Sequence, residues 1–502
     1  MNAPAGSRFR IESPNRWAVL VLLGVAQLMV TLDVTIVNIA LPSAQTALHF
    51  STDDRQWIIT AYTLSFGSLL LLGGKLGDLF GRKWTFVAGL IGFALASALG
   101  GLSQSFGMLV AARALQGVFG ALLAPSALSL LTVTFADSPD RPKAFGIFAA
   151  IAGGGASTGL LLGGAITQAL SWRWCLYVNL LIAVPAAVTA LRIVANVRTP
   201  NRPRIDVPGV LIASAGIFAV VFGFSNAETH SWSAPLTIIA LILSAVLLTV
   251  FGVLERRTAS PLLPLHIVLN RSRGGAYALM ALVGSGVFAL FLFLTFYLQQ
   301  NLGFTPLETG VGFLPFTGMV ILAASQVQTR VLPRAGAKPV VIVGASLATI
   351  AMILLTRLSA GGSYASEVLP SLILAGLGVG SIVATAISTG TLGVKSSDAG
   401  IASAMVNTSQ QVGGSVGTAL LSTIFASAVA SYASSHVGSA GLATAASIHG
   451  YTTAFWWAAG IFGVALLVGT FLLPSARSTR TAATETRAAA APCQAAVSAA
   501  HR

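Results

Sequence analysis

Long apolar runs, separated by short breaks of polar, proline or glycine residues, follow one another along almost the whole chain of 502 residues. Each run approaches the about 20 apolar residues that a helix needs to cross a bilayer. The segments that meet this criterion are 17–40, 57–76, 84–103, 106–132, 145–169, 173–195, 207–225, 233–253, 277–300, 307–329, 338–357, 368–391, 406–430 and 452–473. The pattern predicts an all-α integral membrane protein with fourteen transmembrane helices.

The composition indicates that lipid is the main solvent. Hydrophobic residues make up 55% of the chain and charged residues only 8%, whereas soluble domains carry about 25% charged residues. The net charge of +14 alone would suggest a nucleic-acid partner, but no basic run is interleaved with aromatic residues that could stack on bases. We therefore expect no nucleic-acid partner and assign the basic residues to cytoplasmic loops.

The basic residues also give the orientation. Of the 28 Lys and Arg residues, 24 fall on the side of the membrane that carries both termini. Those on the opposite side are Arg55, Arg173 and Arg357. Because basic residues gather in cytoplasmic loops, we expect a multi-pass protein of the cytoplasmic membrane with both termini in the cytoplasm.

A weak internal repeat predicts the domain organisation. Gly81-Arg82-Lys83 after the second span and Gly336-Ala337-Lys338 after the tenth fall at matching places, and transporter folds commonly contain such repeats. The predicted parts are a cytoplasmic N-terminus at 1–16, an N-terminal six-helix bundle at 17–195, two inserted helices at 207–253, a C-terminal six-helix bundle at 277–473 and a disordered cytoplasmic tail at 475–502.

Two charged residues lie deep inside predicted spans. Asp33 is the one carboxylate well inside a span, and Arg113 is the one cation; Gln116 shares a helix face with Arg113. A charge at the bilayer centre costs about 3 kcal/mol, which favours a functional role over the alternative of a polar residue packed between helices. Burial disfavours the charged form of a carboxylate, so we expect Asp33 to take up and release protons.

Proton movement could drive transport without a nucleotide. One proton crossing 100 mV releases about 2.3 kcal/mol, and a tenfold solute gradient costs about 1.4 kcal/mol. The chain has no G-x-x-x-x-G-K-[ST] phosphate loop, and its two cysteines, Cys175 and Cys493, have no metal-ligand spacing. We expect neither a cofactor nor a metal. Glu308, near the start of the tenth span, is either a second titrating group or a solvated helix-start carboxylate, and we favour the latter.

Two further groups of residues are candidates for transport. Gly155, Gly159 and Gly163 recur on one face of the fifth span, followed by Gly164; this spacing favours close helix packing and also suits a rocking interface. The candidate lining of a substrate pocket comprises Asn38, Phe291, Tyr297, Asn407 and Gln411. The alternative for the aromatic members is contact with lipid or with neighbouring helices.

Several motifs resemble those of one family. Residues 74–83, GKLGDLFGRK, resemble the signature loop of the major facilitator superfamily, and residues 32–42, LDVTIVNIALP, resemble the first-span motif of its fourteen-span drug:proton antiporters. Residues 113–120 resemble the proton-transfer motif of the superfamily, and residues 155–164 resemble its antiporter motif. Trp172-Arg173-Trp174 and Asn179 fit the next landmark of the family, and residues 407–414 resemble a motif of the thirteenth span. Leu160 and Leu181 stand where the family usually has proline.

The resemblance implies the major-facilitator fold, with two six-helix bundles plus two inserted helices. It assigns Asp33, Arg113 and Gln116 to proton coupling. It also implies a cytoplasmic conformational latch made of Gly74, Gly77, Asp78, Gly81, Arg82 and Lys83. The alternative for this loop is a basic segment that only sets topology.

The resulting hypothesis is a monomeric, proton-coupled secondary transporter, embedded in the lipid bilayer, that exports hydrophobic or amphipathic drugs or antibiotics across the cytoplasmic membrane by alternating access. The alternative is a proton-coupled symporter or facilitator that imports a small polar solute. We do not expect an enzyme, because the spans contain no paired carboxylates, zinc motif or G-x-S-x-G nucleophile. No segment resembles a soluble sensing or docking domain.

Overall fold

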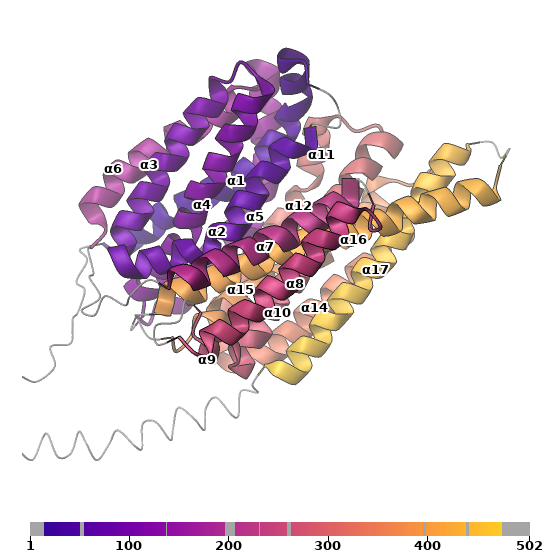
Figure 1. Ribbon diagram of the computed structural model, residues 1–502. Coiled ribbons are helices and arrows are strands. Elements are labelled where there is room, and N and C mark those ends of the chain that lie inside the picture. The colour runs from indigo at the N-terminus through magenta and orange to yellow at the C-terminus, as the bar shows by residue number, and fades with distance from the viewer. Residues whose placement is uncertain are drawn as a thin grey trace, which may run out of the picture. The chain divides into compact units, whose positions relative to one another are not determined.

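The computed structural model describes residues 15–50, 55–136, 138–195, 206–229, 231–258, 263–394, 398–437 and 441–473. Its helices are coloured along the chain in Figure 1. In chain order they are α1 (Arg16–Leu48), α2 (Arg55–Phe80), α3 (Arg82–Gly101), α4 (Phe106–Thr134), α5 (Arg141–Ala169), α6 (Trp174–Ile193), α7 (Val207–Thr229), α8 (Pro235–Glu255), α9 (Leu265–Val268), α10 (Arg271–Phe296), η1 (Tyr297–Asn301), α11 (Pro306–Gly312), α12 (Leu314–Gln326), η2 (Val327–Val331), α13 (Leu332–Ala335), α14 (Ala337–Leu355), η3 (Tyr364–Val368), α15 (Leu369–Gly390), α16 (Ala399–Ser435) and α17 (Leu442–Leu472).

The helices agree with the predicted spans. Thirteen helical segments in the described part of the chain are long and apolar enough to cross a membrane, and α5 adds a further helix of 29 residues. Each of the fourteen predicted segments lies on one of these long helices. The prediction of an all-α, multi-pass membrane protein is therefore confirmed.

The chain forms two compact units. The first contains residues 1–144, 155–264 and 393–408, and the second contains 145–154, 265–392 and 409–502. The inserted helices α7 and α8 thus belong to the first unit, where α7 packs against α8 and α2. The division into two six-helix bundles stays a prediction, and the predicted tail at 475–502 and residues 1–14 lie outside the described residues.

The turn between α2 and α3 differs from the predicted loop. Helix α2 continues through the glycine-rich stretch to Phe80, and Gly81 alone separates it from α3. Gly81 has a φ of 97°, and Gly336, which precedes α14, has a φ of 82°. Both values favour glycine, because a Cβ disfavours positive φ. Positive φ also occurs at Gly303, Gly393 and Gly441, so the predicted repeat stays a prediction.

Helix α8 presents an apolar surface. Its exposed side chains include Leu236, Ile238, Ile239, Ile242, Leu243, Val246, Val250 and Val253. Contiguous exposed apolar surface of this kind is unfavourable in water and is the normal outer surface of a helix that faces lipid. The surface of α8 is therefore suited to the hydrocarbon core of a bilayer.

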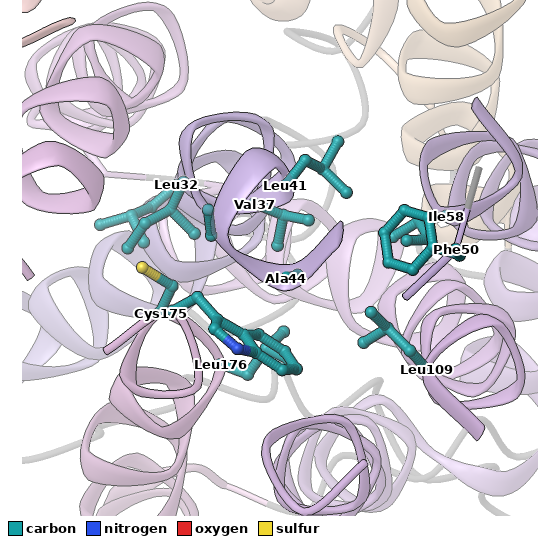
Figure 2. Packing of buried hydrophobic residues seen from close by; sticks show 12 residues of the cluster. Leu32, Val37, Leu41, Ala44, Phe50, Ile58, Leu109, Cys175 and Leu176 are labelled. Carbon is teal, nitrogen blue, oxygen red and sulfur yellow. The ribbon is translucent and has the colours of Figure 1, made fainter. Parts of the chain in front are cut away.

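An apolar cluster fills the interior of the first unit around the second half of α1 (Figure 2). Leu32, Val37, Leu41 and Ala44 follow one another along α1 near Cys175 and Leu176 of α6. The complete cluster is Leu32, Ile36, Val37, Ala40, Leu41, Ala44, Phe50, Ile58, Leu109, Trp172, Cys175 and Leu176. Burial of these side chains packs the starts of α2, α4 and α6 against the end of α1.

Candidate proton-coupling site

The site is centred on the carboxylate of Asp33, in the middle of α1, whose side chain is 0% exposed. Its Oδ2 accepts a hydrogen bond of 2.6 Å from Arg113 Nη1 on α4. Its Oδ1 accepts bonds of 3.0 Å from Gln116 Nε2 and 2.7 Å from Asn179 Nδ2 on α6. The predicted trio of Asp33, Arg113 and Gln116 therefore comes together, with Asn179 as a fourth member.

Arg113 is held by several partners besides the carboxylate. Its Nη1 also donates to Gln116 Oε1 at 2.8 Å, and its Nε donates to the Ile58 carbonyl at 3.5 Å. The guanidinium carbon lies 4.4 Å from the centre of the Tyr62 ring, a cation–π contact. Gln116 Nε2 in turn donates to Ser97 Oγ on α3 at 2.7 Å. Residues of α1, α2, α3, α4 and α6 thus meet at one buried charge pair.

The arrangement satisfies both oxygens of the Asp33 carboxyl group. Three side-chain donors, one of them positively charged, converge on them. A proton on Asp33 would remove the negative charge and so weaken its attraction to Arg113. Ionisable residues buried within membrane spans commonly mark ion or proton pathways, so this pair is a candidate for a functional role.

Sequence reasoning missed two members of this site. Ser97 and Tyr62 are ordinary residues of apolar spans, and nothing in their spacing distinguishes them from packing residues. Asn179 stood out only through its place in a family landmark. An amide within an apolar segment is a usable signal, because burying it requires hydrogen-bond partners.

The glycines of α5 pack directly on the part of α1 that carries Asp33. A Cβ at Gly155 would lie 2.8 Å from Thr31 Cβ, and one at Gly163 would lie 3.1 Å from the Ile36 carbonyl oxygen. Between them, a Cβ at Gly159 would overlap Thr35 Oγ1 and lie 2.9 Å from the Leu32 carbonyl oxygen. Gly164 is also buried, whereas the side chain of Leu160 lies outside the described residues.

Gly159→Ala is expected to displace α1 and with it Asp33. The added methyl meets the backbone of Leu32, and overpacking of this kind costs about 1–3 kcal/mol. Thermal denaturation in detergent should show the lost stability, and substrate transport should fall by about tenfold because α1 is misplaced. Gly460→Ala on α17, where a Cβ meets nothing within 4 Å, is the matched control. Equal behaviour of the two variants would contradict this packing role.

Of the six predicted latch residues, three lie on α2 itself, Gly81 forms the turn, and Arg82 and Lys83 begin α3. Asp78 is buried, and its Oδ1 accepts from Arg82 Nη2 at 2.9 Å and from the Gly400 N–H at 3.3 Å. Gly400 is at the start of α16, where a helix N-terminus favours a negative charge. A Cβ at Gly74 would lie 2.6 Å from the Gly400 carbonyl oxygen. The absence of side chains at both glycines thus allows α2 to approach α16.

The other latch residues have separate contacts. Lys83 Nζ donates to the Leu191 carbonyl at the end of α6, at 2.8 Å. A Cβ at Gly77 would lie 3.4 Å from Ser126 Oγ, an ordinary contact distance. Gly81 provides the turn described above.

The candidate pocket residues fall in different settings. Phe291 packs against Phe313 and Phe316, with ring centres 4.7 and 5.4 Å away. Tyr297 is 0% exposed, and its hydroxyl donates to the Ser359 carbonyl at 2.9 Å. Such burial favours the packing alternative for Tyr297.

The remaining pocket candidates and Glu308 lie in separate places. Asn407 Nδ2 donates to the Ser403 carbonyl one turn earlier at 3.0 Å, and Gln411 is half-buried on α16. The side chain of Asn38 lies outside the described residues. Glu308 accepts from the backbone N–H of Thr305 at 2.8 Å in a capping box at the start of α11, which agrees with a helix-start carboxylate.

Fold and site together define a multi-pass membrane transporter whose interior holds a charge pair. The family model described as the Major Facilitator Superfamily matches residues 23–418. The chain therefore belongs to this superfamily, which is a family of transporters and not of enzymes.

Curated relatives share most of their length with this chain. The puromycin resistance protein pur8 of Streptomyces alboniger is 45% identical over 465 residues, which cover 92% of each chain. The cephamycin export protein CmcT of Amycolatopsis lactamdurans is 35% identical, over 92% of this chain and 93% of its own. The tetracenomycin C resistance and export protein of Streptomyces glaucescens is 35% identical, over 82% of this chain and 76% of its own.

A solved structure shows the same fold. The crystal structure of the human organic anion transporter MFSD10 (TETRAN) matches with a TM-score of 0.62 at 15% sequence identity, and the match covers 91% of this chain and 100% of that one. At this identity the likeness concerns the arrangement of the helices. The predicted major-facilitator fold is confirmed.

Proposed function

We propose that the protein exports antibiotic-like, amphipathic small molecules across the cytoplasmic membrane in exchange for protons, as a monomer with both termini in the cytoplasm. The observation that carries proton exchange is the fully buried pair of Asp33 and Arg113, joined at 2.6 Å. Export is supported by the names of the relatives. They state export of cephamycin, resistance to and export of tetracenomycin C, and resistance to puromycin.

The mechanism follows from the pair. With Asp33 ionised, Arg113 is neutralised and the helices α1, α4 and α6 are tied together through one carboxylate. A proton on Asp33 weakens that tie, which permits these helices to adopt a second arrangement. If substrate and proton favour opposite arrangements, the downhill movement of one drives the uphill movement of the other.

The substrate class is inferred from the chemical variety of the compounds for which the relatives are named. Puromycin, cephamycin and tetracenomycin C, named for three relatives, differ in charge and ring system and share a mixture of apolar and polar surface. A carrier of such compounds recognises shape and apolar surface more than one functional group. Puromycin is the first compound to test, because the relative named for it is 45% identical.

Uptake of puromycin by inverted membrane vesicles tests the proposal. With an acid lumen, vesicles that contain the protein should accumulate puromycin, and an ionophore that removes the pH difference should abolish the accumulation. Puromycin carries an amine and collects in an acid lumen by itself, so vesicles without the protein give the background. Accumulation that is indifferent to the proton gradient would disprove proton exchange, and net uptake of a sugar or amino acid by intact cells would favour the symporter alternative.

A further inference from the structure

Of the two polar atoms of the Asn179 side-chain amide, only one makes a hydrogen bond in the described residues. Its Nδ2 donates to Asp33 Oδ1 at 2.7 Å. Its Oδ1 is buried and accepts no hydrogen bond within the described part of the chain. A buried carbonyl oxygen without a donor is uncommon in folded proteins and asks for an explanation.

A protonated Asp33 would need a hydrogen-bond acceptor, which the present arrangement does not provide. The side chains that contact the carboxylate, Arg113, Gln116 and Asn179, all contact it as donors. A protonated carboxyl group carries an O–H and needs an acceptor. A buried O–H without one is unfavourable, so one of these neighbours has to present an oxygen atom when the proton arrives.

Gln116 is fixed in its present orientation. Its Oε1 accepts from Arg113 Nη1 at 2.8 Å, and its Nε2 donates to Ser97 Oγ at 2.7 Å as well as to Asp33. Reversing this amide would place its NH₂ group against the guanidinium, donor against donor. Arg113 has no acceptor atom. Neither residue can therefore accept the new proton without breaking other bonds.

Asn179 is less restricted, because its side-chain hydrogen bond in the described residues is the one to Asp33 itself. Rotation of its amide by half a turn exchanges Oδ1 and Nδ2, which occupy nearly the same volume. No bond at Oδ1 is lost, because that atom accepts none in the present orientation. The reversed amide accepts a hydrogen bond from the protonated Asp33, and the Nδ2–H···Oδ1 bond is replaced by an O–H···O bond.

We propose that Asn179 is a positioning residue that reverses its amide when Asp33 changes protonation state, so that the buried carboxyl group has a hydrogen-bond partner in both states. The inference rests on the proposed proton exchange at Asp33. It adds that α6, through Asn179, stabilises Asp33 in both protonation states. The proton goes from solvent to Asp33 Oδ1 and returns to solvent on release; Asn179 gains and loses no proton.

Other charged and titratable groups lie around Asp33. Arg113 of α4 is held by Gln116, and its guanidinium stacks on Tyr62 of α2. Cys175, one turn before Asn179 on α6, directs its Sγ to Thr167 and the Gly163 carbonyl. The Tyr62 hydroxyl is also buried without a hydrogen-bond partner in the described residues, but no hydrogen bond joins it to Asp33 there. Of the three side chains that donate to Asp33, only Asn179 has an oxygen that accepts no hydrogen bond from this part of the chain.

Infrared difference spectra of the purified protein, recorded between high and low pH, test the reversal without a substrate. Labelling of asparagine with carbon-13 separates its side-chain carbonyl band from the backbone bands. The parent should show the carboxyl band of protonated Asp33 together with a shift of one labelled amide band to lower wavenumber, as its oxygen gains a hydrogen bond. Asp33→Asn should lack both signals.

Asn179→Ala should lack the amide signal and keep the carboxyl band. A carboxyl band that titrates in the parent with no accompanying amide shift would overturn the proposal, as would an amide shift that persists in Asn179→Ala. Absence of any Asp33 carboxyl band at low pH would overturn both this proposal and proton exchange, whereas a carboxyl band without an amide shift removes only the role of Asn179.

Transport gives an independent readout. Asn179→Leu is expected to lower proton-driven puromycin uptake by about tenfold, the effect of one lost buried hydrogen bond. In the Asp33→Asn background it should cause no further loss of downhill puromycin movement. Asn226→Leu is the matched control, because Asn226 is a buried asparagine of the first unit that bonds to Thr237 at 2.7 Å. Equal losses with and without Asp33 would mean that Asn179 acts only in packing.

Discussion

Asp33→Asn is expected to reduce proton-driven accumulation of puromycin to the background level of vesicles without the protein. A pH difference of two units provides about 2.7 kcal/mol per proton, which sustains a gradient of about 100-fold for a solute exchanged one for one. Asparagine at this position keeps the shape and hydrogen-bonding capacity of a protonated carboxyl group but cannot release a proton. The variant should therefore still equilibrate puromycin across the membrane while losing the ability to concentrate it.

The comparison of concentrative and downhill transport makes this prediction specific. A variant that is merely misfolded loses both activities, whereas an uncoupled variant loses only the first. Undiminished accumulation by Asp33→Asn vesicles under the same pH difference would refute the assignment of Asp33 as the coupling residue. Gly460→Ala, at a position of α17 with open space, should accumulate puromycin as the parent does.

Arg113→Leu is expected to be the most destabilising single replacement at this site. It leaves the carboxylate of Asp33, which is 0% exposed, without its positive partner. Removing one member of a buried ion pair typically costs about 3–5 kcal/mol, because the other charge remains buried and uncompensated. Thermal denaturation of the detergent-solubilised protein should therefore begin at a clearly lower temperature than in the parent.

The double variant Asp33→Asn/Arg113→Leu should recover most of the lost stability, because it leaves no charge unpaired. Asp33→Asn alone should be milder than Arg113→Leu, since the guanidinium keeps its contacts with Gln116, the Ile58 carbonyl and the Tyr62 ring. If the double variant is as unstable as Arg113→Leu, lost packing of the arginine and not an uncompensated charge is the cause.

The fold could be predicted in detail because a bilayer imposes a simple rule. Every backbone polar group in the hydrocarbon core must be bonded within the chain, so apolar runs of sufficient length become helices. The glycine-rich segment before Gly81 predicts a loop, whereas the structure continues α2 through it to Phe80. Contacts such as that of Gly74 with Gly400 explain the glycines, and such contacts between segments distant in sequence leave no local signal.

The site was predictable only as far as charge reveals it. Asp33 and Arg113 stand out because charged residues are rare in spans, and the spacing of Gln116 places it beside Arg113. Ser97 is a small polar residue of a kind common on packed transmembrane helices, and Tyr62 resembles any other aromatic residue. Their roles depend on how α2 and α3 pack against α4, which the local pattern does not encode.

A carrier embedded in an energised membrane must also avoid dissipating the proton gradient while idle. Protons travel along chains of hydrogen-bonding groups, and the apolar side chains of the cluster offer no such chain. They run from Leu32 to Ala44 on α1, with Phe50 beyond the end of α1 and Ile58 and Leu109 beside it. In the proposed orientation, this apolar packing separates Asp33 from the outer end of the first unit. Under the proposed proton exchange, a proton would reach Asp33 from that end only when these helices separate, so the same packing that folds the unit would prevent proton leakage between turnovers.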